Sequence, residues 1–138
     1  MTAIVKDTIA SGAYATAWPG GLPRQAELAA SGARAYIVAA TVHEVAVERK
    51  GRRASIMCRV EIRIAPWYGV DGGEAWELTK AAVATGTARA TTGLRDELVR
   101  LGVRDCVLDV GEAVTADKIL PFLRRLDERH AVHHAARR

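Results

Sequence analysis

The segment from Ala35 to Trp67 constrains the fold of this chain more than any other, because apolar residues recur at every second position along much of it. Alternation with a period of two is typical of a β-strand that has one covered face. Lys50 and Gly51 lie near the middle of the segment and suit a tight turn. We therefore predict a hairpin of two long strands, over about 35–65, with these two residues as its loop.

This loop predicts a register. The covered face carries an almost wholly apolar row, with the pairs Val47–Ala54, Val45–Ile56, His43–Cys58, Thr41–Val60, Ala39–Ile62 and Ile37–Ile64. The other face carries both charge signs and suits contact with water. A slip of one residue would exchange the two faces of the second strand, so a sheet with one covered face holds its register firmly.

A third strand is predicted over Ala75–Thr91, although its alanines also suit a helix. Its inner row is Trp76, Leu78, Ala82, Ala84, Gly86, Ala88 and Ala90, and its outer row is mostly polar or β-branched. Such an outer row is typical of an exposed sheet face. The small inner row would allow a helix to approach unusually closely.

Helices are predicted at both ends of the chain. Thr2–Ser11 and Arg24–Ser31 each stop at a glycine, and Ala13–Trp18 between them is a short strand candidate. Near the carboxyl end, valines and Cys106 recur at steps of three and four within Leu94–Val114, which indicates a helix that covers the core. Gly102 and Gly111 each weaken this helix, a penalty that is more readily tolerated if the helix is pressed against the small-residue strand.

Together these elements predict an α+β fold: a two-layer sandwich of a mainly antiparallel sheet with a long carboxyl-terminal helix on one face. At 138 residues the chain suits one domain, which we place at 1–129. A second helical segment spans Ala116–Arg129 and contains Pro121. We expect residues 130–138 to form a frayed tail rich in His and Arg.

Composition argues against several classes of function. The net charge is +4, and residues 124–138 supply most of it with five arginines against Asp127 and Glu128. A nucleic-acid surface normally spreads its basic residues over one face, so we do not expect nucleic acid as a partner. No apolar run is long enough to span a membrane. Lys6 and Asp7 interrupt the apolar opening, so no signal peptide is expected. The chain as it stands reads as cytoplasmic, and as periplasmic if it is an excised domain.

Candidate catalytic and metal-binding groups are few. The predicted register sets His43 opposite Cys58, but no third orienting group accompanies them, so a core pair is the better interpretation. We read Cys58 and Cys106 as small buried hydrophobic residues, since two cysteines without zinc spacing form no scaffold. His130, His133 and His134 share a helical face and form a weak metal candidate without a further ligand. We therefore predict no catalytic residue, no cofactor and no metal site.

Loose strand and glycine patterns carry a family resemblance. They are Ala33–Val38, Cys58–Pro66, Ala84–Ala88 and the helix end Leu120–Leu123. This arrangement resembles a group of myxobacterial domains that accompany HEAT repeats or occur in envelope lipoproteins, similar to the LpoB and TolB amino-terminal α/β type. The resemblance covers residues 33–126 and implies a non-enzymatic envelope interaction or assembly module.

We therefore predict a protein-protein interaction or assembly module that uses a sheet edge or the exposed sheet face and associates with itself or a protein partner. The predicted interaction residues are Thr85, Thr87, Arg89, Arg59 and Arg63. Two alternatives stay open at this point. One is a structural subunit of a phage-like or secretion ring. The other is a small metal-binding protein or thiol enzyme that uses His43 and Cys58 or the carboxyl-terminal histidines.

Overall fold

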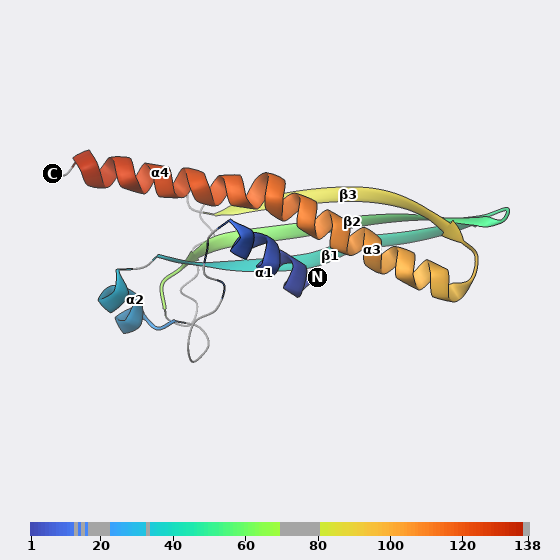
Figure 1. Cartoon of the computed structure of the whole chain (residues 1–138), viewed down its shortest axis with the longest axis horizontal. Coiled ribbons are helices and arrows are strands. Elements are labelled where there is room, and N and C mark those ends of the chain that lie inside the picture. The colour runs from blue at the N-terminus through green and yellow to red at the C-terminus, as the bar shows by residue number, and fades with distance from the viewer. Residues whose placement is uncertain (13, 15, 17–22, 33, 70–80, 137–138) are drawn as a thin grey trace.

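The computed structural model describes residues 1–12, 14, 16, 23–32, 34–69 and 81–136, with the backbone alone for 129–136. Figure 1 shows an elongated molecule in which a long helical run crosses one face of a three-stranded sheet. The elements in chain order are α1 (Thr2–Ser11), α2 (Gln25–Ser31), β1 (Ala35–Lys50), β2 (Arg53–Trp67), β3 (Ala82–Gly93), α3 (Asp96–Val114), the π-helical turn η1 (Thr115–Ile119) and α4 (Leu120–Ala136). This arrangement confirms the predicted α+β fold with a long helix packed on an antiparallel sheet.

The predicted short helices are present as α1 and α2, and Gly12 and Gly32 follow them. Most of the strand candidate at Ala13–Trp18 lies outside the described residues, and Tyr14 and Thr16 are not in a strand. Helix α4 runs to Ala136, so the backbone of most of the expected tail is helical. The division of the chain at residue 129 stays a prediction.

Strand β2 is the centre of the sheet, with β1 and β3 antiparallel on either side of it. The side chains on its helix-facing row are all buried, and they form the middle of the core. They are Ala54, Ile56, Cys58, Val60, Ile62 and Ile64. The alternation predicted for the second strand of the hairpin is therefore confirmed.

The hairpin register differs from the predicted one by two residues. Lys50 pairs with Arg53, so Gly51 and Arg52 form the loop in place of Lys50 and Gly51. Gly51 has a φ of +63°, a left-handed conformation that glycine adopts without steric cost, and a two-residue hairpin loop needs it at its first position. A shift of two residues keeps every side chain of β2 on its predicted face.

A β-bulge in β1 overturns the remaining pairs. Val42 pairs with Val60 and Glu44 with Arg59, so His43 has no pairing partner. One extra residue reverses the alternation between the two halves of a strand. Val38 and Ala40 therefore lie opposite the buried Ile64 and Ile62, in positions predicted for Ile37 and Ala39. The bulge also keeps a polar histidine out of the covered face.

Strand β3 begins at Ala82, and positions 75–80 of the predicted strand lie outside the described residues. Within β3 the predicted faces are confirmed, because Ala84 is buried while Val83, Thr85, Thr87 and Arg89 are exposed. Its inner row meets α3 at Gly86, where an added Cβ would lie 2.4 Å from Val114 Cγ2 and 3.0 Å from Val110 Cγ1.

Helix α3 has its own glycine in this interface. A Cβ at Gly102 would lie 2.5 Å from Thr92 Cγ2 and 2.7 Å from Ile56 Cδ1, so this glycine lets the helix pack tightly on the sheet, as predicted. Gly111 instead lies near Met1 and Ile4 of α1. The two helical glycines therefore serve different neighbours.

The long helix continues through η1 into α4 without a break. The Leu120 N–H donates to the Thr115 carbonyl, five residues earlier, which is the hydrogen bond of a π-turn. Thr115 is fully buried and its hydroxyl donates to the Gly111 carbonyl at 2.7 Å. Pro121 follows directly in the first turn of α4, where its missing N–H is tolerated next to the widened turn.

We expect the two faces of β2 to respond differently to one substitution. Ile62 is fully buried and Arg63 is exposed, so Ile62→Thr should lower the free energy of unfolding by about 2–4 kcal/mol. Arg63→Thr should change it by less than about 0.5 kcal/mol. Chemical denaturation of both variants measures this, and equal losses would contradict the assignment of the faces.

The close approach at Gly86 predicts that Gly86→Ala lowers the free energy of unfolding by about 1–3 kcal/mol, because the new methyl group overlaps Val114. Val114→Ala removes the overlapping atoms. In a double-mutant cycle the combined variant should therefore be more stable than the sum of the two single changes, by about 1 kcal/mol. A Gly86→Ala variant more stable than the parent would show that the helix lies further from the strand.

Candidate functional site: the open sheet face and the edge of β3

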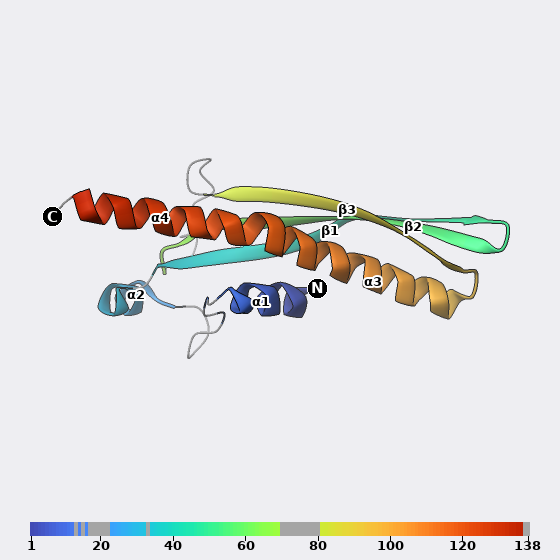
Figure 2. The same ribbon diagram turned by 45° about the horizontal axis from the view of Figure 1, so that its top comes forward.

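Helix α3 packs on β2 and β3 from one side, and on the opposite face the side chains of Arg59, Arg63, Val83 and Thr87 are exposed. Figure 2, turned from the first view, shows the helical layer on that one side. The ladder pairs on the open face include Glu44–Arg59, Glu61–Thr85, Arg59–Thr87, Met57–Arg89 and Arg63–Val83. The sheet thus brings all five predicted interaction residues together on one surface. Their role in binding stays a prediction.

Charge is distributed unevenly across this open face. Its acidic residues are Glu44 and Glu48 on β1 and Glu61 on β2. Glu61 contacts the His43 imidazole, and Glu44 Oε2 lies 3.9 Å from Arg59 Nη2. Strand β3 carries Arg89 and no acidic residue. The surface is therefore mixed near β1 and basic toward β3.

The two edges of the sheet differ in how readily they can pair with another strand. The β1 edge is interrupted by the bulge at His43 and carries Glu44, Arg49 and Lys50. Bulges and charges are devices that prevent edge pairing. By contrast, β3 pairs with β2 in one continuous register from Ala82 to Gly93.

The hairpin loop decides which way the backbone of β3 points. Lys50 and Arg53 close a two-residue loop and exchange hydrogen bonds, so the next residue, Ala54, directs its N–H and C=O toward β3. The same holds for every second residue of β2, and their partners on β3 are Thr92, Ala90, Ala88, Gly86 and Ala84. The residues between them point both backbone groups at the free edge: Thr85, Thr87, Arg89 and Thr91.

Lys118 of η1 contacts this edge. Its Nζ donates to the Thr85 carbonyl at 2.7 Å, and the side chain is exposed. The contact supports the direction assigned to the Thr85 backbone, because the carbonyl is reached from outside the sheet. Sequence analysis did not find Lys118, since the contact joins elements that lie far apart along the chain.

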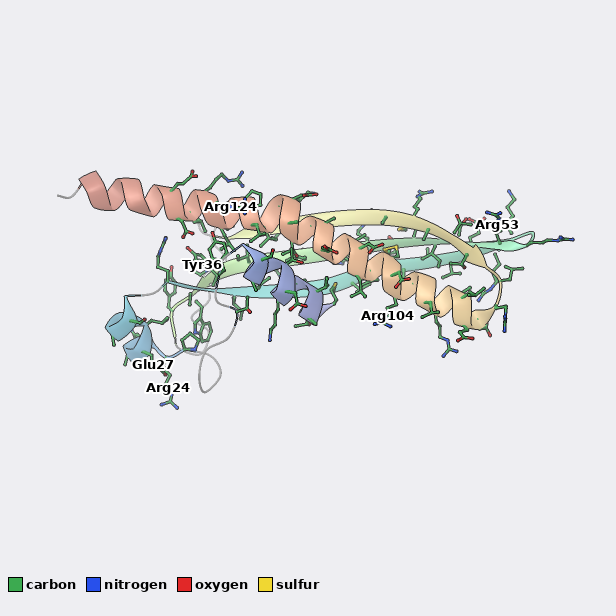
Figure 3. The ribbon with its side chains drawn as sticks, in the orientation of Figure 1. Arg24, Glu27, Tyr36, Arg53, Arg104 and Arg124 are labelled. Carbon is green, nitrogen blue, oxygen red and sulfur yellow. A yellow bond between two sulfur atoms is a disulfide. The ribbon has the colours of Figure 1, made fainter. Side chains whose placement is uncertain are left out.

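The predicted pairing of His43 with Cys58 is wrong. His43 is the bulged residue, with 49% of its side chain exposed, and Cys58 pairs with Val45. Cys58 is fully buried beneath α3, where it forms a disulfide with Cys106 at a Cα–Cα distance of 6.3 Å. Figure 3 shows this bond between the helix and the sheet. Both cysteines are buried as predicted, but they are not free small hydrophobes.

Within the disulfide, neither Cys58 nor Cys106 is a free thiol. The cross-link joins residues 48 positions apart and so reduces the conformational entropy of the unfolded chain. In the chain-entropy account this raises the free energy of unfolding by about 4 kcal/mol. It covalently ties the central strand to the helix that covers it.

The predicted metal candidates His130, His133 and His134 lie in α4, and their side chains are outside the described residues. Among the side chains that are described, no group of three or more His, Cys, Asp and Glu residues is arranged to hold a metal ion.

A pocket of about 660 Å³ lies at the end of the sheet opposite the hairpin tip, where β1 begins and β2 ends. Its walls include Tyr36, Pro66, Trp67, Tyr68 and Leu126. Burial raises the pKa of the Tyr36 hydroxyl above its usual value. Figure 3 shows Tyr36 at this end of the molecule and Arg53 at the other.

Polar contacts hold this end of the molecule together. The Trp67 indole donates to the Pro23 carbonyl at 2.9 Å. Asp127 of α4 accepts hydrogen bonds from Tyr14 at 2.9 Å and Arg34 at 2.8 Å. Sequence analysis missed the pocket, because Tyr36 meets Pro66 only in the bulged register.

Comparison of the chain with protein-family models, with curated proteins and with solved structures gives no match. The resemblance to envelope lipoprotein domains therefore stays a prediction. None of the described helices combines the length and the apolar character needed to cross a membrane.

The buried disulfide predicts the result of a thiol count. Protein unfolded without reductant should show no free thiol, and protein unfolded after reduction should show both cysteines. Labelling with a maleimide followed by intact mass measurement distinguishes the two states. Two reactive thiols in unreduced protein purified from an oxidising compartment would contradict the disulfide.

Proposed function

We propose that this domain is a non-enzymatic assembly module that binds a protein partner, or a second copy of itself, by adding a strand to the free edge of β3. The observation that carries the proposal is the regular edge from Ala82 to Gly93, where alternate residues direct their backbone groups away from β2. Strand addition uses such groups for affinity and the neighbouring side chains for specificity.

The side chains along β3 favour this mode of binding. Its outward-pointing residues are mostly threonines, which are β-branched and present little bulk to an incoming strand. The open face next to them is polar, with Arg59, Glu61 and Arg63 on β2. A polar face beside a regular edge suits pairing at the edge better than packing of two apolar sheet faces.

Two further features support a non-enzymatic role. Cys58 is held in a disulfide, and His43 lies on the opposite face of the sheet beside Glu61. The pair named as a thiol-enzyme candidate is therefore separated. A ring assembled head to tail would need β3 of one copy to pair with β1 of the next, and the bulge at His43 opposes that pairing.

The disulfide also supports the envelope location implied by the family resemblance. Disulfides persist in oxidising compartments such as the bacterial periplasm and are rare in the cytosol. A structural disulfide buried between β2 and α3 suits a domain that works outside the cytoplasm.

The Thr85→Pro variant tests whether the free edge of β3 binds the partner. Proline removes an N–H that points away from β2, so we expect association to weaken by at least about tenfold while the denaturation midpoint changes little. Thr85→Val keeps the N–H and should associate like the parent. Ala84→Pro removes an N–H that points toward β2 and should lower the midpoint strongly.

Association of these variants is measured by sedimentation at increasing concentration and by capture from lysate of the source cells on immobilised domain. The proposal fails if Thr85→Pro associates as well as Thr85→Val. It fails equally if the parent domain is a monomer at high concentration and captures no partner.

A further inference from the structure

The cations along the edge of β3 indicate the charge of a strand that would pair there. Arg89 lies on the open face in the rung of Met57 and Ala46, so no charged residue lies directly across from it. The nearest charge on β2 along the diagonal is the like-charged Arg59. Within the described part of the chain, no ion pair involves Arg89.

Lys118 supplies a second cation to the same edge. Its ammonium donates to the Thr85 carbonyl, which is a backbone acceptor that an added strand would need. Thr85 and Arg89 are four residues apart on β3, or about 13 Å along the strand. An added strand would displace Lys118 from this carbonyl and leave a free ammonium beside it.

Carboxylates on the added strand would satisfy both cations. An ammonium that leaves a neutral carbonyl for a carboxylate gains a charge-assisted hydrogen bond. A carboxylate beside Arg89 would give that guanidinium an ion pair in place of its like-charged neighbour. The acidic residues of the open face, Glu44, Glu48 and Glu61, lie on β1 and β2.

We propose that the strand that pairs with β3 is acidic, with two carboxylates about four residues apart that bind Lys118 and Arg89. This inference rests on the proposed strand addition and specifies the chemistry of the partner. The two cations would repel an incoming strand of like charge and attract a strand of opposite charge. The edge therefore selects for an acidic partner.

Synthetic strand peptides of about ten residues test this proposal. One peptide carries two glutamates four residues apart in a threonine and valine background. In two matched peptides, glutamine or lysine replaces both glutamates. Titration calorimetry at low and moderate salt should show the glutamate peptide binding about two- to tenfold more tightly than the glutamine peptide, and the lysine peptide binding least.

Protein variants assign the effect to the two cations. Lys118→Met and Arg89→Gln should each reduce the preference for glutamate over glutamine several-fold and leave the affinity for the glutamine peptide little changed. Lys50→Met removes a cation on β1 at the hairpin tip and serves as the matched control, which should keep the full preference. Added salt should reduce the preference in the parent domain.

Equal affinity for the glutamate and glutamine peptides, with loss of both in Thr85→Pro, would overturn the acidic partner and leave strand addition standing. Failure of all three peptides, in a domain that still self-associates through Thr85, would also overturn the acidic partner alone. No peptide binding together with no association would overturn both proposals.

Discussion

The contact between α3 and the small residues beneath it is the constraint on which this fold depends. Gly86 of β3 and Gly102 of α3 leave no room for a Cβ, so the helix lies closer to the sheet than ordinary side chains would allow. Close approach lets a thin layer of valines, isoleucines and a disulfide fill the core. A chain with so few aromatic residues can form a dense core in this way, because packing density depends on how closely complementary surfaces meet.

The same contact decides which surfaces remain free. One helical run crosses β2 and β3 diagonally and covers a single face of the sheet (Figure 1). Among the described residues, the run contacts the β3 edge through Lys118 and leaves most of the opposite face of the sheet exposed. The β1 edge is bulged, whereas the β3 edge is regular. The geometry that forms the core therefore also produces the edge for which we propose a binding role.

Local sequence patterns could predict the faces of β2 and β3. From Cys58 to Ile64 the apolar residues alternate with charged ones, and alternation survives any shift by an even number of residues. The small inner row of β3 likewise indicated close approach of a helix before the position of that helix was known. These features depend on residues that are neighbours along the chain, so the sequence alone predicts them.

The bulge at His43 was not predicted, although the apolar positions change phase there, from Val42 to Val45. Ile37 and Ala39 are also apolar, so the first half of β1 suits either face and hides the change of phase. The disulfide was equally hidden. Cys58 and Cys106 each occupy a buried position, but only the crossing of α3 over β2 brings their Cα atoms to 6.3 Å. The contact of Lys118 with Thr85 depends on the same crossing and on the π-turn that carries the lysine.

The sequence by itself determined the hairpin, the covered faces of β2 and β3 and the class of the fold, because short-range periodicity specifies which side chains must leave water. Only the tertiary structure decided the register of β1, the pairing of the cysteines and which edge stayed regular. Those features depend on how two segments that are distant in the sequence pack together. The side-chain periodicity within each segment is compatible with several such packing arrangements.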